Sequence, residues 1–242
     1  MGRSFSDITL YTPTPHAVGT IEYLEDTSLQ NYVSDLYVQK MHGYKPPKTS
    51  RITIQPAYHN VWNRTWKNGS IIAIAPFYDE VKYTSLDKGG KYQYILDLIH
   101  GATLQLSEEY KWDRSVFDNA YKEVIENDFK FEIIYPKKLS RDKKKVASLI
   151  IEKSHILTTV HVNIEANGSA SKIKLFDKKN VWWYDCVYFL ARQNKWLDSN
   201  TFGIGYKGKI EVWYSIVDKK VRLFENGNPV EELDFTKYFL FG

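Results

Sequence analysis

The chain has 242 residues, of which 43% are hydrophobic and 26% charged, and its formal net charge is +4. This composition is typical of a globular chain with an ordinary core, and the charge is too balanced to require a nucleic-acid partner. The only cysteine, Cys186, excludes an intrachain disulfide. Met1–Leu10 lacks the apolar run of a signal peptide, and no apolar run reaches membrane-spanning length. We therefore expect a cytoplasmic protein without membrane insertion.

The first 86 residues predict a β-rich segment that contains one helix. Asn68-Gly69 between two β-like runs is a strong hairpin signal. Helical spacing of apolar residues from Leu29 to Met41 predicts a helix, capped by a residue among 26–28. The predicted strands are 6–11, 18–24, 51–55, 61–66 and 70–77.

After Gly90 the spacing of the apolar residues changes to that of a helix, and two amphipathic helices are expected. Apolar residues recur at helical spacing from Ile95 to Tyr110, and again in adjacent pairs from Val116 to Ile125. Asp113 is the predicted cap of the second helix. Because the link between the helices is short, the two should lie antiparallel and cover one face of a sheet.

From Phe129 onward the pattern predicts short strands joined by tight turns. These strands are expected at 129–135, 146–152, 157–165, 172–176, 201–206, 209–216 and 221–224. Asn226-Gly227 is a turn that leads into the last segment, 230–241. The apolar segment Val181 to Leu190 fits either a buried strand or a helix. The fold class is therefore α+β, mostly antiparallel sheet with an antiparallel helical pair packed on one face. We expect one domain over 1–242, with a candidate boundary between a β-rich part, 1–86, and the remainder, 87–242.

No motif in the chain indicates a catalytic or cofactor site. The histidines lack the spacing of a zinc site, and no nucleophile elbow or P-loop occurs. Cys186 is expected to be a small buried hydrophobe, and His100 a satisfied, partly buried histidine. His161 and Glu165 share one face of a predicted strand, so an enzyme with a scattered site near these two residues is an alternative. We expect no catalytic residue, metal or cofactor.

Two groups of residues are candidates for partner binding. Trp62 and Trp66 flank Arg64, a composition that resembles interface hot spots, and one of Trp182 and Trp183 is expected to be exposed. The run 137–145 is strongly basic and supports a nucleic-acid-binding alternative, but a solvated hairpin loop is the favoured explanation. The candidate partner-binding residues are Trp62, Arg64, Trp66, Trp183, Lys137, Lys138 and Arg141.

Three segments carry a resemblance to a known group of proteins. Tyr94 to His100, Tyr110 to Tyr121 and Lys195 to Phe202 are similar to patterns in small Bacteroidota-type proteins, some of which look like immunity proteins of antibacterial toxin systems. The resemblance covers about half of the chain. It implies a non-catalytic protein that occludes the active site of a cognate toxin.

Overall fold

The computed structural model describes residues 5–13, 16–58, 64–180 and 187–235. The chain divides into two compact units, Met1–Lys130 and Phe131–Gly242, and each is described separately. This division differs from the single domain expected from the sequence. The boundary lies after the helical pair rather than near residue 86, because both helices pack with the helix that follows the first strand. The α+β class is confirmed.

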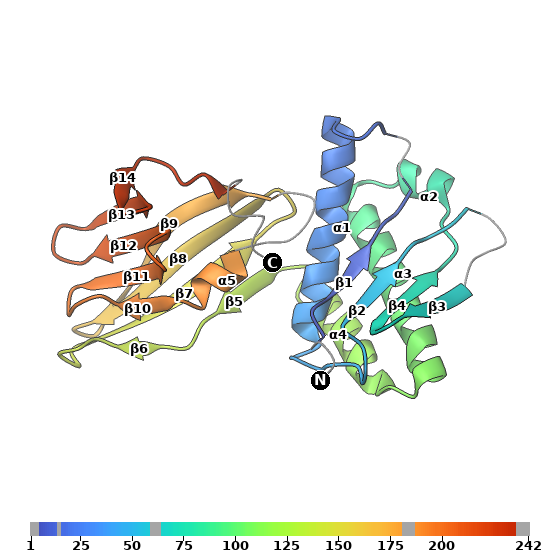
Figure 1. The fold of residues 1–242 in the computed structure, drawn as a ribbon, viewed down its shortest axis with the longest axis horizontal. Helices are drawn as coiled ribbons and strands as arrows, with labels where there is room; N and C mark the ends of the chain where they lie inside the picture. The colour runs from blue at the N-terminus through green and yellow to red at the C-terminus, as the bar shows by residue number, and fades with distance from the viewer. Residues whose placement is uncertain (1–4, 14–15, 59–63, 181–186, 236–242) are drawn as a thin grey trace. The chain divides into compact units, whose positions relative to one another are not determined.

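The first unit contains a four-stranded sheet in the order β1-β2-β4-β3 (Figure 1). Strands β1, β2 and β4 are parallel, whereas β3 pairs antiparallel with β4 and forms one edge of the sheet. The hairpin predicted at Asn68-Gly69 is confirmed, since the chain reverses between these strands through Gly69, whose φ is +60°. The strands are β1 Asp7–Leu10, β2 Arg51–Ile54, β3 Arg64–Asn68 and β4 Ile71–Ala75.

The described part of the first unit also contains four helices, and three of them, α1, α3 and α4, pack against one another. Figure 1 shows α3 and α4 behind the sheet. The sheet residues Ile52, Ile54 and Ile74 are fully buried, and each such side chain contributes about 1.5–3 kcal/mol to stability. The helices are α1 Ile21–Lys40, α2 Glu80–Ser85, α3 Lys88–Tyr110 and α4 Arg114–Glu126. None of the described helices is both long enough and apolar enough to cross a bilayer.

The strand predicted at 18–24 is wrong, because α1 already begins at Ile21. The side chain of Thr20 accepts a hydrogen bond from the Tyr23 N–H at 3.3 Å and so caps the helix. The cap expected at 26–28 therefore lies inside α1. Over so few residues, apolar side chains at Val18, Ile21 and Leu24 fit a helical face as well as an irregular strand.

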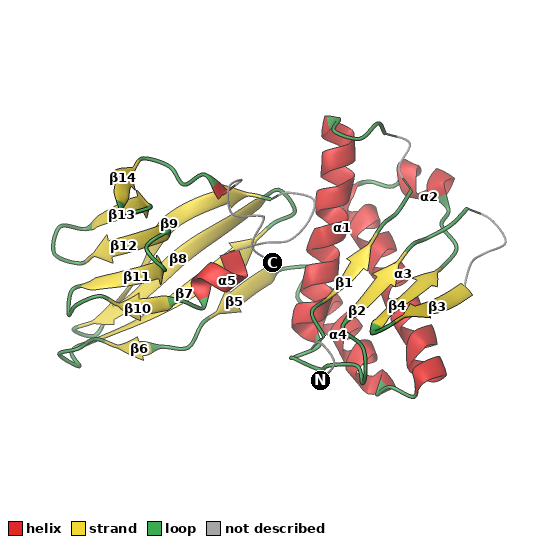
Figure 2. Cartoon of the chain, in the orientation of Figure 1, coloured by secondary structure: helices red, strands yellow, loops and turns green. Residues whose placement is uncertain are grey.

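In the described part of the second unit, two antiparallel sheets share one apolar core, and Figure 2 shows the strands of both. One sheet has the order β5-β7-β8-β9, with β6 also paired to β7, and the other has the order β10-β11-β12-β13-β14. The strands of the first sheet are β5 Phe131–Ile134, β6 Lys138–Leu139, β7 Lys145–Lys153, β8 Leu157–Ala166 and β9 Ser169–Lys179. Those of the second are β10 Asn194–Trp196, β11 Thr201–Tyr206, β12 Ile210–Ser215, β13 Lys220–Glu225 and β14 Asn228–Val230.

The segment 181–190 fits either a strand or a helix from its sequence. In the structure its end forms a short helix, α5 Val187–Ala191. Residues 181–186, which include Cys186, lie outside the described part of the chain. The last segment, 230–241, is described only as far as residue 235. There β14 ends at Val230, and a loop follows it.

Candidate functional site

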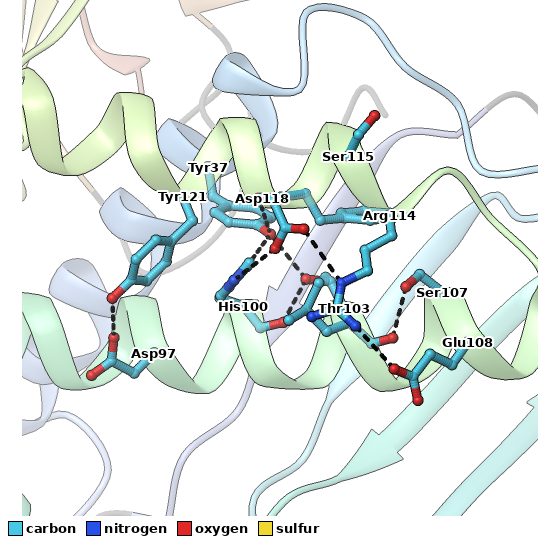
Figure 3. Close-up of polar contacts among 12 residues, drawn as sticks. Tyr37, Asp97, His100, Thr103, Ser107, Glu108, Arg114, Ser115, Asp118 and Tyr121 are labelled. Carbon is cyan, nitrogen blue, oxygen red and sulfur yellow. Dashed lines mark hydrogen bonds and ion pairs between the residues drawn. The ribbon is translucent and has the colours of Figure 1, made fainter.

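A group of polar contacts in the described part of the first unit joins α1, α3 and α4 (Figure 3). We call it the His100 cluster. It contains Tyr37 from α1, Asp97, His100 and Thr103 from α3, and Arg114, Asp118 and Tyr121 from α4. These helices pack face to face, so their inward polar side chains must find partners among themselves.

Both ring nitrogens of His100 face other side chains. Its Nδ1 lies 3.1 Å from the hydroxyl of Tyr37, and its Nε2 lies 3.4 Å from the carboxylate of Asp118. The ring of Tyr121 stacks on the imidazole, with the two centroids 4.4 Å apart. The Tyr37 hydroxyl also lies 2.9 Å from the Thr103 hydroxyl, and it donates to the Phe117 carbonyl at 3.2 Å. The cluster therefore links three helices through one imidazole and one phenol.

The outer rim of the His100 cluster is made of exposed ion pairs and hydrogen bonds. Arg114 pairs with Asp118 at 3.3 Å and with Glu108 at 3.0 Å. The Tyr121 hydroxyl donates to the carboxylate of Asp97 at 2.8 Å. Exposed pairs of this kind contribute little stability. They do set the position of the Asp118 carboxylate beside the imidazole.

This arrangement suits a structural brace better than acid–base catalysis. A general base needs a nitrogen that can reach a substrate proton, but here each nitrogen of His100 faces a protein group and Tyr121 covers one side of the ring. Burial lowers the pKa of His100, and the charge of Asp118 opposes that shift only in part. Within the described residues, no three side chains of metal-ligand type gather in one place.

The lowered pKa of His100 predicts that stability falls as the medium becomes acidic. The unfolded chain binds a proton to this residue more readily than the folded chain, so the free energy of unfolding decreases as pH drops below the ordinary histidine value of 6.5. Chemical denaturation at a series of pH values measures this slope. The slope should be smaller in His100→Gln than in the wild-type chain. Equal slopes in the two proteins would contradict the assignment.

A pocket of about 310 Å³ lies between the end of α1 and α4. Its charged groups largely pair with one another. His42 Nε2 lies 2.7 Å from Glu123, and Lys40 lies 4.0 Å from the same carboxylate. The pocket therefore presents no unmatched charge cluster that would select a ligand.

The basic hairpin of the second unit uses much of its charge internally. Lys137 pairs with Glu165 at 2.6 Å, and Lys138 donates to the carbonyl of Asn194. Lys145 contacts the carboxylate of Asp142 at 3.0 Å, and hydrogen bonds from Ser140 and Lys144 help to hold the pKa of that carboxyl below its usual range. These contacts do not favour the nucleic-acid alternative, because phosphate binding requires cations that are free to make it.

Arg141, the third candidate in this hairpin, is exposed beside the turn. The hydrogen bond from the Asn200 backbone N–H is the main cause that lowers the pKa of Asp198, and the charge of Arg141 adds to it. Lys137, Lys138 and Arg141 are all in the second unit, whereas Arg64 and Trp66 are in the first. The candidate residues therefore belong to two different units.

The structure pairs His161 with a different carboxylate from the one expected. Its Nδ1 lies 3.4 Å from Glu152 on the neighbouring strand, without the geometry of a hydrogen bond. Glu165 instead pairs with Lys137. Residues four apart on a strand share a face but lie about 13 Å apart along it. Cross-strand neighbours, not strand periodicity, decide which charges meet here.

Arg64 and Trp66 lie on the edge strand β3, and Trp62 and Trp183 fall outside the described residues. Successive side chains of a strand point to opposite faces, so Arg64 and Trp66, which are two residues apart, share one face of the sheet. Trp66 stands opposite Ala73, and its side chain is 39% exposed. On the same face Arg51 is neutralised by Asp7 at 2.6 Å. Arg64 has no carboxylate within 4 Å among the described residues.

The opposite face of β3 contacts the end of α3. Thr65 donates from its hydroxyl to Glu109 at 3.1 Å, and Lys67 places its ammonium 5.9 Å from the centre of the Tyr110 ring. The face that carries Arg64 and Trp66 is therefore the one turned away from the helices. We call Arg64, Trp66 and Asn68 on this face the β3 surface.

Comparisons with known proteins gave no family: no family model, curated protein or solved structure matched the chain.

Proposed function

We propose that this chain is a non-catalytic protein-binding protein of the cytoplasm, and specifically an immunity protein that neutralises a cognate antibacterial toxin by occlusion. The observation that carries the proposal is the β3 surface. An exposed tryptophan and an unpaired arginine alternate along one edge strand. Tryptophan and arginine are the residues most enriched at interface hot spots.

The neighbourhood of these residues supports this use of the β3 surface. A hot spot combines a rigid aromatic side chain with a charge that a partner can satisfy. The hairpin fixes the backbone of Trp66 opposite Ala73, and among the described residues its indole N–H has no hydrogen-bond partner. The sheet behind it is backed by fully buried residues such as Ile72 and Ile74, so binding would require little reordering.

The proposal predicts that truncating the β3 surface weakens partner binding without changing the fold. We expect the partner to be a secreted protein encoded beside this chain. The tagged chain is used to capture that protein, and the stoichiometry of the complex is measured by native mass spectrometry. Trp66→Ala and Arg64→Ala should each weaken a one-to-one complex by about 30-fold, the effect of a typical hot-spot residue. The matched control is Tyr11→Ala, whose side chain is 50% exposed beside the opposite edge strand, and which should bind as wild type.

Growth provides the functional readout. Cells that express the captured protein should die, and co-expression of the wild-type chain should rescue them, whereas Trp66→Ala should rescue poorly. If the neighbouring protein is not toxic, or if the chain forms no stoichiometric complex with it, the immunity proposal fails.

A further inference from the structure

We infer that the β3 edge recognises its partner by strand addition, and that the added strand is extended and acidic on one face. This inference deepens the proposed function and rests on it for the identity of the partner. The pairing itself is a property of the first unit and can be tested without that partner.

The hydrogen-bond register shows which backbone groups of β3 are available. The carbonyl of Ile74 accepts from the N–H of Gln55, which continues β2, so this position of β4 faces β2. Alternation then turns Ala73 and its odd-numbered neighbours toward β3, where Ala73 pairs with Trp66. The N–H and C=O groups of Thr65 and Lys67 therefore point away from the sheet.

These outward groups form a short template for another strand. No further strand lies beyond β3 in the described sheet, and neither Thr65 nor Lys67 has a backbone hydrogen bond on its outer side among the described residues. An unpaired edge strand either has features that block pairing with another chain or binds an extended segment. Two outward residues give an added strand up to four main-chain hydrogen bonds, since each offers one donor and one acceptor.

Charge selects the kind of strand that fits. Arg64 points away from the helices and lacks a carboxylate partner among the described residues, whereas Glu109 already lies on the helix side. Acidic side chains are thus favoured on the Arg64 face. A second copy of β3 would offer Arg64 no carboxylate, because Arg64–Asn68 contains no acidic residue. The occupant is therefore an acidic strand of another protein.

The test uses amide hydrogen exchange measured by NMR, with short synthetic peptides as probes. In the free protein, the amides of Thr65 and Lys67 should exchange fast and that of Trp66 slowly. A peptide that alternates Glu with Thr should slow exchange at Thr65 and Lys67, and the same peptide with Lys in place of Glu should not. Absence of protection by the acidic peptide at high concentration would overturn the inference and show a guarded edge.

Two variants separate pairing from charge. Lys67→Pro removes an outward N–H but no hydrogen bond to β4, so the hairpin should persist while peptide binding is lost. Arg64→Glu should weaken binding of the Glu peptide by about fivefold per charge pair, and the variant should bind the Lys peptide in preference. Unchanged peptide preference in Arg64→Glu would overturn the charge argument. If the peptide protects β3 but no toxin partner is found, strand addition stands and the immunity proposal fails. The two outcomes are therefore distinguishable.

Discussion

Replacing Gly203 with alanine is expected to disrupt the second unit. Gly203 lies on β11 opposite Trp213 of β12, and a Cβ atom built there would stand 1.9 Å from the carbonyl oxygen of Val212. That oxygen belongs to the backbone of a paired strand, so a rotamer change cannot relieve the clash. Overpacking usually costs about 1–3 kcal/mol, and we expect the upper end of this range or more, because the sheet must separate locally.

Scanning calorimetry of the full chain measures the effect. The transition of the second unit should move to lower temperature or disappear in Gly203→Ala. Gly101→Ala is the matched control, since Gly101 lies in the interior of α3 with nothing within 4 Å of a built Cβ. That substitution should raise stability by about 0.5–1 kcal/mol by improving helix propensity. Wild-type melting in Gly203→Ala would contradict the close strand approach.

Replacing Tyr37 with phenylalanine is expected to loosen the helices of the first unit. The Tyr37 side chain is fully buried, and its hydroxyl contacts His100, Thr103 and the Phe117 carbonyl. Without the hydroxyl these buried groups lose a shared partner, which costs about 1–3 kcal/mol. The pH dependence assigned to His100 should change as well, because its Nδ1 loses a neighbour.

Urea denaturation followed by circular dichroism measures this loss. Tyr11→Phe is the control, because the Tyr11 side chain is 50% exposed and its hydroxyl has no hydrogen-bond partner among the described residues. Its stability should stay within about 0.5 kcal/mol of wild type. A similarly small effect in Tyr37→Phe would show that the His100 cluster is not a brace.

The parts of the fold that depend on local chemistry could be predicted from the sequence. Asn68-Gly69 marked the hairpin because a tight turn favours residues that accept positive φ. Asp113 marked the start of α4, where its carboxylate accepts from the N–H of Ser115 at 3.0 Å. The start of α1 was misplaced because the cap at Thr20 competes with several other polar residues nearby.

The candidate sites depend on contacts that the sequence does not reveal. The Tyr37 hydroxyl and His100 are 63 residues apart, and no local pattern links them. The composition around Arg64 and Trp66 drew attention to β3, but its place at the sheet edge follows from the strand order β1-β2-β4-β3. In that order β2 pairs in parallel with β4, although β3 lies between them in the sequence. The periodicity of the strands cannot predict which strands become neighbours.

Hydrogen exchange of the complex tests the central claim most directly. The chain is bound to the captured partner, and deuterium uptake is compared with that of the free chain, segment by segment. We predict that the strongest new protection falls on Arg64–Asn68 of β3. Protection confined to other segments, with β3 exchanging as it does in the free chain, would contradict the account.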